Sequence, residues 1–280
     1  MSFLATPDGT RLRVCDRGSG ARTFVLVHGW KQSHRLWDPV VARLAQRHRV
    51  VALDLRGMGE SDKPNSHYTF PELAGDLAFL LDRLELEDVT LVGWSMGCSV
   101  SLQLLDSGEP RVGRLVLVNG PLRLTRTADF PHGLTDEELA GYVGDVERHW
   151  PLRERRFLAG SLLAAEREHV DWLVSVALQT PLDVAVRLVR AQETLDQRTV
   201  VERLPVPVLA AWSRRDPYWP VGLADWIAER APDGRRVLFD RSAHCTPFEE
   251  PDRFCETIER FAAGTLEPES RDHDPEEVRP

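Results

Sequence analysis

The chain has 280 residues, of which 42% are hydrophobic and 28% charged; these values exclude collagen-like, low-complexity and wholly disordered chains. Its length predicts one large domain, with room for an inserted lobe. The net charge of -9 would repel a phosphate backbone, so we expect no nucleic-acid partner. Because no apolar run approaches the roughly 20 residues of a membrane span and the N-terminus lacks a signal-peptide pattern, we expect a cytoplasmic protein without a membrane partner.

Nucleotide, metal and disulfide signatures are missing from the sequence. No G-x-x-x-x-G-K-[ST], G-x-G-x-x-G or H-E-x-x-H string occurs. The four cysteines are far apart and show no C-x-x-C spacing, which indicates free thiols rather than a zinc site or a disulfide framework. We therefore expect no cofactor and no metal, and a small-molecule substrate as the partner. The sequence carries no signal for the oligomeric state.

Short apolar runs alternate with amphipathic segments over the first 120 residues. The predicted strands are residues 12–16, 23–27, 49–54, 89–93 and 114–118. The predicted helices, in which apolar side chains recur every three or four residues, are 37–47, 70–84 and 95–106. Strands that alternate with helices predict an α/β fold with a mostly parallel, doubly wound sheet covered on both faces.

The alternation stops between residues 121 and 204, and helical patterns follow one another there at 135–150, 152–165, 169–178 and 181–195. We therefore predict an all-helical cap at 121–204, inserted into a hydrolase-like core made of 1–120 and 205–263. In the second part of the core, strands 207–212 and 236–240 alternate with helices 220–230 and 252–262. Residues 264–280 are acidic and lack an apolar period, which predicts a disordered tail.

A G-x-S-x-G pentapeptide lies at 93–97, between a predicted strand and a predicted helix. A serine held on so sharp a turn needs small neighbours, since larger side chains would clash with the strand and the helix. The turn also places the hydroxyl at a helix N-terminus. Ser95 is therefore the candidate nucleophile.

A serine hydroxyl is a weak nucleophile until a base takes its proton, and the base needs a third group to orient it. Asp216 follows strand 207–212 and His244 follows strand 236–240. Open parallel sheets place their active groups in loops at the carboxyl ends of strands. The sequence predicts that Ser95, His244 and Asp216 form a catalytic triad.

The oxyanion of a tetrahedral intermediate needs backbone amides as donors. One candidate is Met96, directly after the nucleophile. The other is Trp30, in the loop that follows strand 23–27. No metal ligand is needed for this chemistry.

These motifs resemble the α/β-hydrolase fold family over residues 3–263. The resemblance rests on five segments: 28–30, 54–62, 93–97, the loop at 215–216, and 243–244 followed by Glu249 and Pro251. Segments 28–30 and 95–97 are most similar to those of bacterial aryl esterases and cofactor-free haloperoxidases, which are perhydrolases and esterases. Cys98 stands where that family usually has glycine.

The resemblance implies Ser95 as nucleophile, His244 as base, Asp216 as acid, and Trp30 and Met96 as oxyanion donors. Some relatives take the acid from the loop after the strand that ends here at 118. Asn119 occupies that place in this chain, so Asp216 keeps the role.

The predicted function is that of a serine hydrolase, which cleaves a small, largely apolar carboxylic ester or lactone through an acyl-enzyme. Perhydrolysis, hydrolysis of a C–C bond, and acyl transfer or cyclisation use the same triad and stay open. A cofactor-free oxygenase that uses only the His-Asp pair is an alternative of another class, and so is a non-catalytic protein on a hydrolase fold.

The cap is expected to roof the site and to set specificity. We predict a substrate pocket lined by aromatic side chains of the core and of the cap: Trp30, Trp94, Phe130, Tyr142 and Trp150. An apolar pocket favours acyl groups of modest size over sugars, phosphates or peptides.

Overall fold

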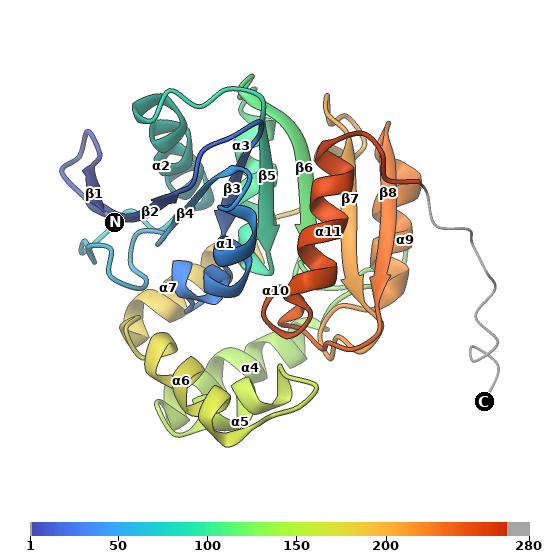
Figure 1. Cartoon of the computed structure of the whole chain (residues 1–280). Helices are drawn as coiled ribbons and strands as arrows, with labels where there is room; N and C mark the ends of the chain where they lie inside the picture. Colours follow the sequence, from blue (N-terminus) through green and yellow to red (C-terminus); the bar gives the residue numbers. More distant parts are fainter. Residues whose placement is uncertain (1, 268–280) are drawn as a thin grey trace.

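A computed structural model describes residues 2–267 of the chain (Figure 1). Its centre is an eight-stranded sheet in the order β1-β2-β4-β3-β5-β6-β7-β8. The pairs β1–β2 and β2–β4 are antiparallel, and all other neighbouring pairs are parallel. The strands are β1 (Ser2–Ala5), β2 (Arg11–Arg17), β3 (Thr23–Val27), β4 (Arg49–Leu53), β5 (Val89–Trp94), β6 (Val112–Val118), β7 (Val208–Ser213) and β8 (Gly234–Phe239).

Two apolar layers cover the two faces of this sheet. Along β3, Val25 and Val27 belong to one layer, and Phe24 and Leu26 belong to the other, as the two-residue period of a strand requires. The first layer packs against α2 (Phe70–Arg83), α3 (Met96–Asp106) and α9 (Val221–Arg230). The second packs against α1 (Asp38–Leu44) and α11 (Pro251–Ala262), which run side by side in Figure 1. The predicted mostly parallel α/β fold is confirmed.

Five helices lie between β6 and β7 in the chain, and the four longer ones lie at the end of the sheet where the parallel strands terminate (Figure 1). We call the segment from residue 121 to residue 204 the cap. Thr135 begins its first helix with a capping box, because its Oγ1 accepts from the Glu138 amide at 3.0 Å and the Glu138 carboxylate accepts from its amide at 2.7 Å. The helices are α4 (Asp136–His149), α5 (Arg153–Gly160), α6 (Arg167–Ala177) and α7 (Leu182–Glu193), followed by the short α8 (Arg198–Val201).

Four short elements were not expected from the sequence: β1, the 3-10 helix η1 (His34–Trp37), α8 and α10 (Thr246–Glu249). Each has four residues, which is too few to show a period. β1 is also mostly exposed and pairs only at the sheet edge, so its side chains lack the apolar alternation of a buried strand. From residue 268 on, the predicted tail lies outside the described residues.

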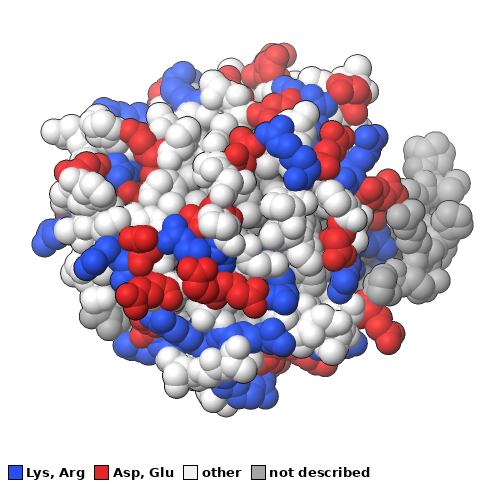
Figure 2. All heavy atoms as spheres, turned by 90° about the horizontal axis from the view of Figure 1, so that it is seen from above, with Lys and Arg blue, Asp and Glu red and all other residues white. Residues whose placement is uncertain are grey.

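The end of the molecule that faces away from the cap carries Lys and Arg interspersed with Asp and Glu, without a large area of one sign (Figure 2). Within residues 2–267, no single helix is both long enough and apolar enough to cross a bilayer; only α6 and α7 counted together, bent at 87°, meet that criterion.

Candidate active site

The turn between β5 and α3 holds Ser95 in a strained backbone conformation, with φ at +55°. The two glycines of the pentapeptide are required by close backbone contacts. A Cβ on Gly97 would lie 2.3 Å from the Val27 carbonyl oxygen, and one on Gly93 would lie 2.5 Å from the Gly97 carbonyl oxygen. The Ser95 amide donates to Val118 at 2.9 Å. The turn therefore holds Ser95 above the carboxyl ends of β5 and β6.

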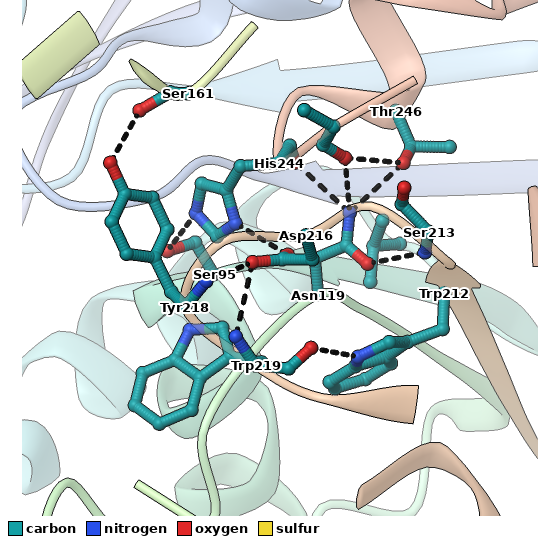
Figure 3. Close-up of polar contacts among 12 residues, drawn as sticks. Ser95, Asn119, Ser161, Trp212, Ser213, Asp216, Tyr218, Trp219, His244 and Thr246 are labelled. Atoms are coloured by element: carbon teal, nitrogen blue, oxygen red, sulfur yellow. Dashed lines mark hydrogen bonds and ion pairs between the residues drawn. The ribbon is translucent and has the colours of Figure 1, made fainter. Parts of the chain in front are cut away.

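The side chains of Ser95, His244 and Asp216 form one continuous hydrogen-bonded chain (Figure 3). The distance from Ser95 Oγ to His244 Nε2 is 3.0 Å, and that from His244 Nδ1 to Asp216 Oδ2 is 2.8 Å. Because an ionised carboxylate can only accept, Nδ1 carries the proton and Nε2 is left to accept the serine proton. The structure brings the three predicted residues together in the geometry that a nucleophile and a general base need.

The Asp216 carboxylate is itself fixed by the backbone. Its Oδ1 accepts from the amides of Tyr218 at 2.7 Å and Trp219 at 3.1 Å, and its side chain is fully buried. The other oxygen is thereby aimed at His244. Short charge-assisted bonds of this kind lock a carboxylate in one orientation.

His244 is held from both sides. Its ring lies 5.2 Å from that of Trp94 and meets the Tyr218 ring edge-on at 4.9 Å. Its carbonyl accepts from Trp94 Nε1 at 2.8 Å, and its amide donates to the Ser161 carbonyl of the cap at 3.1 Å. The base is therefore positioned by the core and by the cap together.

Asn119, which follows β6, joins the loops that carry His244 and Asp216. Its Nδ2 donates to the His244 carbonyl at 3.0 Å and to Thr246 Oγ1 at 2.9 Å, while its Oδ1 accepts from the Ser213 amide at 2.9 Å (Figure 3). From the sequence, Asn119 was noted only because it occupies the position at which some relatives carry the catalytic acid. Its position at the carboxyl end of a central strand is the signal that could have identified this role.

The predicted oxyanion donors come from two segments: Trp30 follows β3, and Met96 follows Ser95 at the start of α3. Neither the Trp30 amide nor the Met96 amide donates to any acceptor within residues 2–267. A Cβ on Gly29 would lie 2.9 Å from Ser95 Cβ, so the loop that carries Trp30 passes directly beside the nucleophile. The two amides are thus available near Ser95, as an oxyanion site requires.

A buried histidine shapes the start of this loop. His28 Nδ1 donates to the Gly29 carbonyl at 2.7 Å, and its Nε2 accepts from the Leu55 amide at 3.0 Å. Full burial lowers the pKa of His28 below its ordinary value, which keeps the ring neutral. A neutral ring can make both bonds, one as donor and one as acceptor.

A cavity of about 310 Å³ opens beside Ser95 and His244. Of the five predicted pocket residues, Trp30 and Tyr142 line it. Most of the remaining lining is apolar and comes from the core loops and the cap: Met96, Pro121, Leu124, Leu134, Leu139, Phe157, Val189, Gln192, Pro217, Tyr218 and Trp219.

The other three predicted pocket residues are not part of the cavity lining, which corrects that expectation. Trp94 packs beside the His244 ring and bonds its carbonyl. Phe130 is buried edge-on against Trp226, with the ring centroids 5.5 Å apart. Trp150 lies with its ring centroid 5.5 Å from the Lys31 ammonium. Aromatic character marked these residues as apolar, but it does not distinguish a core contact from a cavity wall.

The cap and the loop after β3 are joined by a buried ion pair that the sequence analysis did not foresee. Lys31 Nζ lies 2.5 Å from Glu154 Oε2, with side-chain exposures of 1% and 0%. The ammonium also lies 3.8 Å from the Trp30 ring centroid, and Trp30 Nε1 donates to the Ala185 carbonyl at 2.9 Å. Burial lowers the pKa of Lys31 to about 8, although Glu154 opposes this shift.

Residues 22–251 match the family model of the alpha/beta hydrolase fold. The chain belongs to this family. The prediction of an α/β-hydrolase is therefore confirmed.

Named relatives of this α/β-hydrolase include esterases. It is 30% identical over 237 residues to the pimeloyl-[acyl-carrier protein] methyl ester esterase of Nitrosomonas europaea, covering 82% of this chain and 92% of that one. The structure is similar to that of an esterase from Exiguobacterium antarcticum, with a TM-score of 0.88, 26% identity, and coverage of 94% and 99%. It is also similar to a bromoperoxidase from Bacillus anthracis, with a TM-score of 0.85, 26% identity, and coverage of 91% and 96%.

Proposed function

We propose that this α/β-hydrolase cleaves a small, largely apolar carboxylic ester or lactone through an acyl-enzyme on Ser95. The observation that carries the proposal is the hydrogen-bonded chain from Ser95 through His244 to Asp216, which opens on an apolar cavity. A cavity of about 310 Å³ lies at the small end of ligand sites. The esterases among the relatives support an ester as the bond that is cleaved.

In the proposed reaction, His244 Nε2 takes the proton of Ser95 as Oγ attacks the substrate carbonyl carbon. The oxyanion that forms accepts hydrogen bonds from the amides of Trp30 and Met96. His244 then gives the proton to the leaving alcohol, and the acyl group stays on Ser95. A water molecule, deprotonated by the same imidazole, releases the acid in the second half of the reaction.

A second candidate is perhydrolysis, which the likeness to a bromoperoxidase favours. It uses the same acyl-enzyme, but hydrogen peroxide takes the place of water and the product is a peracid. The two activities are separated by supplying peroxide with the ester and by measuring peracid against free acid.

Replacement of Ser95 tests the proposed function. We expect Ser95→Ala to lower kcat/KM for p-nitrophenyl butyrate by about 10³- to 10⁶-fold, as loss of a triad serine does. Ser107→Ala is the matched control, because Ser107 is exposed at the other end of α3 and should leave the rate unchanged. Near-full activity in Ser95→Ala would overturn the acyl-enzyme and would favour chemistry by the His-Asp pair alone.

A further inference from the structure

One polar side chain of the cap lies among the apolar residues of the cavity wall. Gln192, on α7, lines the cavity and is only 5% exposed. Apolar residues that line the same cavity are Pro121, Leu124, Leu134, Leu139 and Val189. A buried amide in apolar surroundings is costly unless its hydrogen-bonding groups find partners.

Several other polar side chains of the wall have partners within the protein. Ser95 and His244 bond each other. The Tyr218 hydroxyl lies 3.0 Å from Ser161 Oγ, and the Tyr142 hydroxyl bonds Arg153. The amides of Trp30 and Met96 also lack a partner in the described part of the chain, but an N–H group can only donate. Gln192 is therefore the side chain to examine for an unmet acceptor.

The neighbours of Gln192 decide which end of its amide faces the cavity. Its Nε2 donates to Ser99 Oγ at 3.0 Å. Ser99 in turn gives its hydroxyl proton to the Pro121 carbonyl at 3.3 Å, and a carbonyl can only accept. Because that proton is engaged, the Ser99 oxygen must accept, and Gln192 must present its NH₂ group to it.

The carbonyl oxygen Oε1 of Gln192 is left without a hydrogen-bond donor in the part of the chain that the structure describes. It is not among the unpartnered atoms that protein encloses completely. Since Gln192 lines the cavity, this oxygen is an accessible acceptor on a wall that is otherwise apolar.

Helix α3 relates Ser99, the partner of the Gln192 amide, to Ser95. Ser99 follows Ser95 by four residues, which is one helical turn or about 6 Å along the axis. A substrate whose carbonyl lies at Ser95 would reach Gln192 with a group several bonds farther along its chain.

We infer that Gln192 is a specificity residue, which accepts a hydrogen bond from a hydroxyl or amide N–H on the substrate. The inference rests on the proposed function and narrows it: the preferred ester or lactone carries a donor group at the far end of an otherwise apolar chain. A substrate that ends in a carboxylate or a second ester is disfavoured, because its oxygens would face the Gln192 oxygen without a proton between them.

Paired substrates test this inference. For p-nitrophenyl esters of butanoate, hexanoate and octanoate and of their ω-hydroxy derivatives, kcat/KM is measured with the wild-type enzyme. At one chain length we expect the ω-hydroxy ester to be favoured about two- to tenfold over the plain ester, the effect of one hydrogen bond. The six-carbon p-nitrophenyl ester whose far end is a methyl ester has hydrogen-bond acceptors but no donor there. It should have the lowest kcat/KM of the six-carbon substrates.

Three variants show whether Gln192 causes the preference. In Gln192→Leu, kcat/KM for the ω-hydroxy ester divided by kcat/KM for the plain ester of the same length should fall to one or below. Ser99→Ala frees the amide to turn its NH₂ toward the cavity, so it should raise the relative rate for the substrate that ends in a methyl ester. Val189→Ala, one turn away on α7, changes the cavity wall without touching the amide and should keep the wild-type ratio. Urea unfolding confirms that each variant is folded.

The outcomes separate the inference from the proposed function. Hydrolysis of plain esters with no preference for the hydroxyl at any length would overturn the inference alone, and so would a preference that Gln192→Leu retains. If the wild-type enzyme hydrolysed none of the esters, the proposed function would fall and this inference with it.

Discussion

The sheet edge and the cap hold their shares of the site by different means. At the sheet edge, the side chains are oriented by hydrogen bonds to backbone groups. Two amides fix Asp216, and Asn119 bonds the His244 carbonyl and the Ser213 amide. The cap is also joined to the core by side chains, through the buried pair of Glu154 on α5 and Lys31 in the loop after β3. Backbone contacts depend on the strand register, whereas the cavity wall depends on which side chains the cap carries. We therefore propose that the cap, rather than the sheet edge, sets the substrate.

The two regions also meet at the base. The Ser161 carbonyl of the cap accepts from the His244 amide at 3.1 Å. Glu249 accepts from the Ala243 amide of the core at 2.8 Å and from the Leu163 amide of the cap at 2.6 Å. The cap thus takes part in positioning His244, in addition to covering the cavity.

The largest effect should come from the sheet edge. Asp216→Asn keeps an oxygen for the amides of Tyr218 and Trp219, but it turns an NH₂ group toward His244 Nδ1. The imidazole must then accept at Nδ1 and carry its proton on Nε2, where it can no longer take a proton from Ser95. We expect kcat for p-nitrophenyl butyrate to fall about 10⁴-fold with the fold unchanged.

The double variant Asp216→Asn/Asn119→Asp is the sharper control. It moves the carboxylate to the place that some relatives use, but here that side chain faces the His244 carbonyl and Thr246. We expect no recovery of activity. Recovery to within tenfold of the wild type would show that position 119 can also supply the acid, whereas near-full activity in Asp216→Asn alone would show that our assignment of Asp216 is wrong.

Much of the sheet edge could be predicted from the sequence, because each group there follows a recognisable strand. Ser95, Asp216 and His244 all come directly after apolar runs, and a parallel sheet brings the ends of such runs to one edge. The role of Asn119 could not be predicted, since its three partners come from loops far away in the sequence.

The cap was harder to predict. Apolar spacing indicated its helices, but the same spacing is compatible with several rotations of each helix. Phe130 and Trp150 were therefore predicted to line the cavity but do not, while Phe157 and Gln192, which do line it, were not among the predicted pocket residues. The pair of Lys31 and Glu154 joins residues 123 positions apart, and no local pattern announces such a contact.

The second largest effect should come from the join between cap and core. Glu154→Leu leaves the buried ammonium of Lys31 without its carboxylate, beside Arg153, and should cost about 3–5 kcal/mol in the free energy of unfolding near neutral pH. Urea unfolding measures this cost.

The same variant should recover stability as the pH rises. Burial holds the folded-state pKa of Lys31 near 8, below the ordinary 10.5, and removal of Glu154 lowers it further. At pH values between the folded-state pKa of Lys31 in the variant and the ordinary pKa, the unfolded chain binds a proton that the folded protein has released. The free energy of unfolding therefore increases with pH, by at most about 1.4 kcal/mol per pH unit. Lys31→Met/Glu154→Leu lacks the titrating group and should show no such rise. If Glu154→Leu were as stable as the wild type at neutral pH, the stabilising role of the Lys31–Glu154 pair would be wrong.

The most direct test of the central claim is covalent labelling of the nucleophile. The wild-type enzyme is treated with a p-nitrophenyl alkylphosphonate, which transfers its phosphonyl group to an activated serine, and the adduct is located by peptide mass spectrometry. We predict one adduct, on Ser95, formed in parallel with the loss of ester hydrolysis and absent from Ser95→Ala. Complete loss of activity with the adduct on another residue, or full ester hydrolysis without any adduct, would contradict the account.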